Sequence, residues 1–207
     1  TDSATCIAQD TIQVLVNQLP VANAGADTSA CTNEMIVIGG APTGPSGSTY
    51  TWSPAGGLSD ANSANPTATI TGTQIYTVTV TDSSTCSSTD VITINALAIP
   101  NVDAGPDTTI CAGSTVQLNG TGSGTLQWTP IFGLSDPDIG NPFANPEATV
   151  TYTLTVTGGN LCVNTDQTTV TVNVLPNANA GPDLSICAGD SIQLQATGPG
   201  TYNWSPA

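Results

Sequence analysis

Three copies of one short motif punctuate the chain of 207 residues: Asn23-Ala-Gly-Ala-Asp27, Asp103-Ala-Gly-Pro-Asp107 and Asn179-Ala-Gly-Pro-Asp183. A cysteine and then a tryptophan follow each copy, at Cys31 and Trp52, at Cys111 and Trp128, and at Cys187 and Trp204. Successive tryptophans are 76 residues apart. A fixed period of this length is typical of a tandem array. The repeat, rather than any single motif, therefore predicts the fold.

The repeat predicts four segments. Residues 20–99 and 100–175 are complete repeats, called the first and second repeat below. Residues 1–19 match the C-terminal part of a preceding repeat, and residues 176–207 match the N-terminal part of a following one. Each repeat opens with a proline-containing linker, and proline stiffens such a joint because it fixes φ.

The charge is entirely acidic, with 15 Asp and Glu and no Lys, Arg or His. Binding to nucleic acid or to an anionic membrane surface needs cationic side chains, so neither is expected as a partner. Without imidazole or lysine, most acid–base and nucleophilic machinery is excluded, and we expect no enzyme and no catalytic residue. Six cysteines at regular places indicate an oxidising compartment. The expected location is extracellular or at a cell surface.

Strict alternation of polar and apolar residues marks Thr151-Tyr-Thr-Leu-Thr-Val-Thr157 as a strand. Further strands of the second repeat are expected at 107–111, 115–119, 125–129 and 168–174, with a long loop over 130–146. No segment has helical periodicity, so the fold class is all-β, with sandwich domains. The expected core residues are Trp52, Trp128, Trp204, Tyr76, Tyr152, Leu118 and Leu154.

The motif, the tryptophan followed by Ser-Pro at Trp52 and Trp204, and the Tyr-Thr-Val-Thr-Val-Thr strand at 76–81 together resemble the PKD-like and immunoglobulin-like repeats of large bacterial surface proteins. More narrowly, they resemble repeats of adhesins exported by the type IX secretion system of gliding bacteria. The resemblance implies tandem sandwich domains in a head-to-tail rod that serves as a shaft, filament or adhesin. One departure is Trp128-Thr-Pro-Ile-Phe132, after which the loop is expected to pack differently.

Two cysteine pairings remain open. Pairs within a repeat would join Cys31 to Cys86 and Cys111 to Cys162, although an immunoglobulin-like topology puts those positions at opposite ends of the domain. Alternatively, a bond across the joint would join Cys31 to Cys162. Cys6 and Cys187 would then have partners outside the window or across a joint, and pairs such as Cys86 with Cys111 are a third, smaller alternative.

Acidic loops raise the question of calcium. Asp60, Asp136 and Asp138 lie in corresponding loops and are the candidate ligands. Calcium needs six or more oxygens, and neither loop has a recognised calcium-binding pattern. Solvated turn residues are the preferred interpretation, so no cofactor is expected.

Short Asp-Ser and Asp-Thr sequences resemble the O-glycan acceptor pattern of the same bacteria. The candidate acceptors are Ser3, Thr11, Thr108 and Ser191. The alternative interpretation is ordinary β-propensity, because threonine suits a pleated surface.

The sequence therefore predicts the structural shaft of an extracellular filament or long adhesin, with neighbouring copies of the repeat as partners, a glycan or surface ligand at an unseen tip, and no membrane insertion in this window. The alternative is an array of carbohydrate-binding modules. Sugar platforms need exposed aromatic side chains, most aromatics are assigned to the core, and Phe132 and Phe143 in the long loop of the second repeat are the spare candidates.

Overall fold

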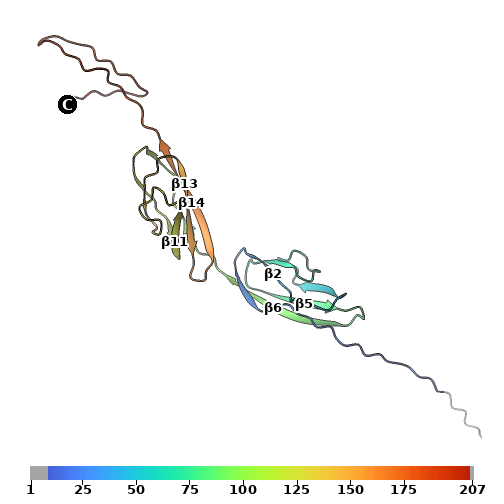
Figure 1. Cartoon of the computed structure of the whole chain (residues 1–207). Helices are drawn as coiled ribbons and strands as arrows, with labels where there is room; N and C mark the ends of the chain where they lie inside the picture. The colour runs from blue at the N-terminus through green and yellow to red at the C-terminus, as the bar shows by residue number, and fades with distance from the viewer. Residues whose placement is uncertain (1–8, 206–207) are drawn as a thin grey trace, which may run out of the picture. The chain divides into compact units, whose positions relative to one another are not determined.

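The computed structural model describes residues 9–205. The described residues form strands, turns and irregular segments but no helix, and hence no helix able to span a membrane. The chain divides in sequence between Ile99 and Pro100 into two units, which Figure 1 colours from blue to green and from green to red. Each unit contains one complete repeat.

The first repeat has a four-stranded sheet in the order β1-β6-β5-β3 and a two-stranded sheet that pairs β2 with β4. The strands are β1 (Thr28–Cys31), β2 (Met35–Val37), β3 (Thr49–Ser53), β4 (Thr67–Thr69), β5 (Gln74–Thr81) and β6 (Ser87–Leu97). β1 runs parallel to β6, and all other pairs are antiparallel.

The second repeat has the corresponding sheet in the order β11-β13-β14-β8, with β9 paired to β12 and β7 to β10. Its strands are β7 (Val102–Asp103), β8 (Thr108–Cys111), β9 (Val116–Gln117), β10 (Thr121–Gly122), β11 (Thr125–Thr129), β12 (Phe143–Ala144), β13 (Val150–Thr157) and β14 (Val163–Asn173). β8 is parallel to β14, as β1 is to β6.

Alternation along the strands produces the two faces of each main sheet. Tyr76, Val78 and Val80 of β5 are buried, while the threonines between them lie on the opposite, more exposed face. In β13, Tyr152, Leu154 and Val156 repeat this pattern. Each repeat therefore has its own hydrophobic core, and both cores are built from corresponding residues.

A tryptophan lies at the centre of each complete core. Trp52 and Trp128 are fully buried, and the indole Nε1–H of each donates to a backbone carbonyl 11 residues later, at Ser63 and Ile139, with donor–acceptor distances of 2.9 Å. A buried indole N–H needs such a partner. The predicted core residues Tyr76, Tyr152, Leu118 and Leu154 are buried as well.

The prediction that Trp204 is a core residue is wrong for this structure, since its side chain is 50% exposed. In the complete repeats, the corresponding tryptophan packs beside a paired strand, β5 or β13. Within the described residues 176–205, backbone pairing is limited to the bridge between Asn179 and Thr197, so no paired strand covers the indole.

Candidate functional site

The repeated motif closes each repeat by hydrogen bonds. Its first residue accepts the backbone N–H of the glycine two positions later in all three copies: Asn23 to Gly25 at 3.0 Å, Asp103 to Gly105 at 2.8 Å and Asn179 to Gly181 at 2.8 Å. These glycines have φ values of 92°, 78° and 81°, and residues other than glycine adopt this backbone conformation only at an energetic cost. The motif is thus a tight turn with a side-chain cap.

The remaining positions of the motif attach this turn to the last strand of the same repeat. The alanine N–H donates to a carboxylate of that strand, from Ala24 to Asp90 and from Ala104 to Asp166, both at 2.8 Å. The final aspartate accepts a backbone N–H from the same strand, with Asp27 bound to Thr93 and Asp107 to Thr169. Sequence reasoning identified the motif but not this function.

These bonds affect the ionisation of Asp166. The backbone N–H groups of Ala104 and Gln167, in that order, lower the pKa of the Asp166 carboxyl below its ordinary value, and partial desolvation opposes them. The folded state therefore favours the ionised form of the Asp166 carboxyl.

The proline that leads each repeat is bound to its own repeat. The carbonyl of Pro20 accepts the Ser88 hydroxyl, and the carbonyl of Pro100 accepts the Asn164 side-chain amide at 3.0 Å. Ser88 and Asn164 occupy corresponding positions of the last strands. The start of each linker is therefore fixed relative to the domain that follows it.

The cysteines do not form the pairs expected within a repeat. Cys31 and Cys162 are each disulfide-bonded, whereas Cys86, Cys111 and Cys187 are free thiols. Both within-repeat pairs need a cysteine that is a thiol in this structure. Cys6 lies outside the described residues.

The parallel strand pairing explains why these pairs are absent. Cys31 lies beside Leu97 at the end of β6, while Cys86 immediately precedes the start of the same strand. Eleven residues at about 3.3 Å each separate these positions by more than about 30 Å, whereas bridged Cα atoms are about 5.5 Å apart. Cys111 and Cys162 are separated in the same way by the length of β14.

The candidate calcium residues lie in tight turns. Asp60 and Asp136 each accept a backbone N–H from the residue two positions later, at 2.9 Å. Among residues 9–205, acidic, cysteine and histidine side chains form no group of three that could hold a metal. The turn bonds explain why aspartate recurs in these loops.

The candidate glycan acceptors fall in different environments. Thr11 and Ser191 are exposed, Thr108 is half-buried in β8, and Ser3 lies outside the described residues. The backbone N–H of Thr11 donates to the adjacent Asp10 carboxylate.

A groove of about 530 Å³ lies at one end of the second repeat. Its walls come from the turn after β11 and from the segment between β12 and β13, and they include Phe132, Pro146, Glu147 and Thr149. Phe132 is a candidate site residue of the sequence analysis, and it lines this groove with its side chain 63% exposed. Phe143 is also exposed but does not line the groove.

The first repeat has a smaller groove of about 350 Å³ at the corresponding place. Gly56 lines it where the second repeat has Phe132, and Thr71 and Gly72 replace Glu147 and Ala148. A large apolar wall is therefore a property of the second repeat.

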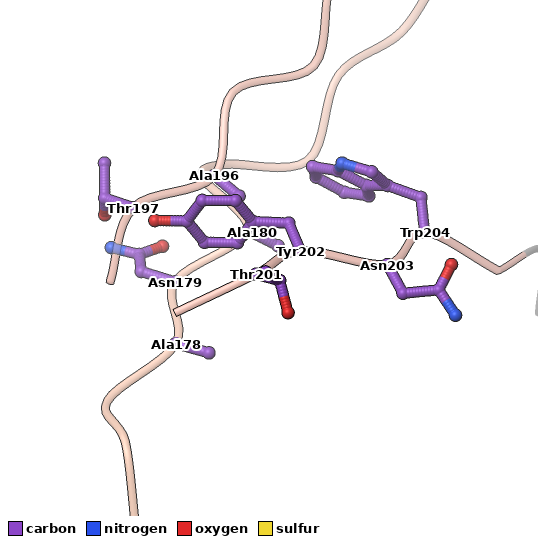
Figure 2. A pocket seen from close by; sticks show the side chains of 9 residues that line it. All are labelled: Ala178, Asn179, Ala180, Ala196, Thr197, Thr201, Tyr202, Asn203 and Trp204. Carbon is purple, nitrogen blue, oxygen red and sulfur yellow. The ribbon is translucent and has the colours of Figure 1, made fainter. Parts of the chain in front are cut away.

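A third hollow, of about 270 Å³, lies among residues 178–204 and is drawn in Figure 2. Tyr202 and Trp204 line it together with Asn179 and Ala180. The residues that correspond to Ala180 and Trp204 in the second repeat, Ala104 and Trp128, are buried. This hollow is consequently an uncovered core surface, and its aromatic side chains are not evidence for a ligand.

No protein-family model and no curated protein matches the sequence. Similar solved structures include hemolin, an insect immune protein (13% identity, TM-score 0.38, covering 74% of this chain and 47% of hemolin). The N-terminal eight Ig domains of the Down syndrome cell adhesion molecule are 18% identical, with TM-score 0.38 and coverage of 87% and 32%. Sidekick-1 immunoglobulin domains 1–4 are 13% identical, with TM-score 0.33 and coverage of 86% and 59%.

The chain spans less than two thirds of the length of each of these three structures. At these identities and TM-scores, the likeness assigns neither a family nor a function to the chain. The architecture of the chain is all-β, with two tandem units that each contain a four-stranded sheet, smaller two-stranded pairings and a hydrophobic core of their own.

Proposed function

We propose that this chain is part of the shaft of an extracellular filament or long cell-surface adhesin and acts as a non-catalytic structural element. The observation that carries the proposal is the shared architecture of the two complete repeats. Their main sheets have the same strand order and the same parallel pair, and their tryptophan and tyrosine hydrogen bonds differ in length by at most 0.1 Å.

This shared architecture favours a structural role. A domain selected for a specific reaction usually diverges from its neighbours at the site, whereas a shaft needs every unit to fold alike. The conserved residues of both repeats serve closure: the motif binds the last strand, and the leading proline is held by its own repeat. Repeating this unit lengthens the chain on one common scaffold.

The proposed location is the outside of a cell, and the resemblance to repeats exported by type IX secretion suggests a bacterial source. Disulfide-bonded Cys31 and Cys162 support an oxidising compartment. The proposed partners are neighbouring copies of the repeat and other chains of the filament, with any surface ligand at a tip outside this sequence.

Electron microscopy of the native assembly tests the proposal. A shaft predicts fibres or stalks with a periodicity of one repeat length along the axis. Isolated particles without extended stalks, seen in material purified without proteolysis, would contradict it.

An array of carbohydrate-binding modules is the second candidate, and the observation in its favour is the exposed Phe132 in a groove. An array of sugar sites requires a platform in each repeat. The first repeat has Gly56 at that position. The carbohydrate-binding candidate therefore rests on a single site, in the second repeat.

A further inference from the structure

The two repeats provide an internal comparison of one loop, which follows β3 in the first repeat (residues 54–66) and β11 in the second (residues 130–142). The loop backbone is held identically. The backbone N–H of Ser59 donates to Thr67 at 2.8 Å, and that of Ser135 to Phe143 at 2.9 Å. The bridge from Leu58 to Ala68 corresponds to the bridge from Leu134 to Ala144.

On this shared backbone, four positions in or next to the loop change from small or polar to large and apolar. Ala55, Gly56, Ser63 and Thr67 of the first repeat correspond to Ile131, Phe132, Ile139 and Phe143 of the second. The four larger side chains are 63%, 63%, 42% and 55% exposed. The first repeat forms the same loop backbone without them, so the loop does not depend on these side chains, and all four are exposed.

An exposed apolar side chain that folding does not need indicates a contact with another molecule where it also lines a groove. One of them, Phe132, lines the groove of about 530 Å³, a size typical of ligand-binding clefts. Glu147 lines the same groove and is exposed. The surface thus combines apolar side chains with negative charge, and no positive side chain exists anywhere in the chain.

We propose that the groove of the second repeat is a docking site for a basic peptide segment of a partner protein, with lysine or arginine alternating with apolar residues. Charge complementarity carries the choice of partner. The net charge of −15 attracts cations and repels acidic partners. A cation beside Glu147 can also contact the face of Phe132, and an apolar side chain can pack against Phe132 and Val150 in the groove. A neutral sugar uses none of this charge.

The test uses the whole chain and a labelled peptide of eight residues that alternates lysine with leucine, measured by fluorescence anisotropy at physiological salt. A peptide that alternates lysine with serine has the same charge and reports non-specific attraction. We expect the leucine peptide to bind at least tenfold more tightly than the serine peptide, and Phe132→Gly to remove this difference.

The first repeat supplies the matched controls. Phe132→Gly restores the residue found at position 56, so the fold is expected to persist, and circular dichroism checks it. Phe143→Thr restores the residue at position 67 outside the groove and should change binding less than twofold. The double substitution Gly56→Phe and Thr71→Glu should create a second site, because it gives the first groove the counterparts of Phe132 and Glu147 and a Cβ at Gly56 meets no atom within 4 Å.

Equal binding of the leucine peptide to the original chain and to the Phe132→Gly variant would overturn the proposal. So would binding of cellohexaose that Phe132→Gly abolishes while the peptides bind alike, since the ligand would then be a neutral glycan. The proposed shaft does not depend on either result, because the electron microscopy that tests for fibres does not involve this groove.

Discussion

Asp166 accepts the backbone N–H of Ala104 at 2.8 Å, a contact between residues 62 positions apart that fastens the last strand of the second repeat to its opening motif. Asp90 and Ala24 form the same bond in the first repeat. The two repeats are therefore closed by the same contact, in which a carboxylate of the last strand accepts a hydrogen bond from the turn that opens the repeat.

Replacing Asp166 with alanine should destabilise the second repeat by about 1 kcal/mol, a value at the low end for a hydrogen bond to a charged group because solvent screens this carboxylate. The Ala104 N–H, which belongs to a buried residue, would lose its acceptor. Urea denaturation measures the change. Asp138→Ala is the matched control, since that side chain is exposed. An equal loss of unfolding free energy in both variants would show that the bond from Ala104 to Asp166 contributes nothing to stability.

The lowered pKa of Asp166 predicts a dependence of stability on pH. Because the folded carboxyl has the lower pKa, its contribution is complete above the unfolded pKa, near 4, and is lost as the pH falls through the folded pKa. The difference in unfolding free energy between the original chain and Asp166→Asn should therefore shrink between pH 6 and pH 2. A difference that grows on acidification would have the wrong sign for this mechanism.

The three tryptophans should respond differently to replacement by phenylalanine. Trp52→Phe and Trp128→Phe each leave a cavity and an unpaired carbonyl at Ser63 or Ile139, and each should cost about 2 kcal/mol in its own repeat. Trp204→Phe should change stability by less than about 0.5 kcal/mol, because that indole is half exposed. Thermal unfolding of the three variants gives the ranking, and equal losses would contradict it.

The main sheets were largely predictable from the sequence, because alternation identifies long half-buried strands. The expected strand at 151–157 is β13, and 125–129 is β11. The last strand begins at Val163 rather than at 168, and its start was missed because residues 164–167 are all polar and show no alternation. β12 was missed because Phe143 and Ala144 lie in a segment rich in Pro, Gly and Asp, where two paired residues leave no periodic signal.

The groove could be predicted only in part. Phe132 stood out as an aromatic residue without a core role, but Glu147 joins it through a loop contact that no sequence spacing reveals. The buried positions of the motif were equally hidden, because Ala104 and its partner Asp166 are brought together only by the strand order.

The states of the cysteines predict a chemical labelling pattern. Alkylation without reduction should modify Cys111 and Cys187, which are exposed thiols, whereas Cys31 and Cys162 should react only after reduction. Trypsin cannot cut this chain, but cleavage before aspartate places Cys31, Cys86, Cys111 and Cys162 in separate peptides. Mass spectrometry without reduction then identifies the linked peptides. The bond from Cys31 to Cys162 stays a prediction of the sequence, and a linked pair of Cys111 with Cys162 would refute it.

Removal of divalent cations should leave stability unchanged. The Asp60 and Asp136 carboxylates already accept backbone N–H groups in their own turns, and calcium requires six or more oxygen ligands, far more than one turn aspartate supplies. Thermal unfolding in EDTA and in excess calcium should therefore give the same Tm. A fall of several degrees in Tm in EDTA that calcium reverses would show a calcium site. Asp136→Asn would then identify the repeat that holds the ion. An ion bound in the second repeat should bind more weakly without that carboxylate, whereas an ion bound in the first repeat should be unaffected.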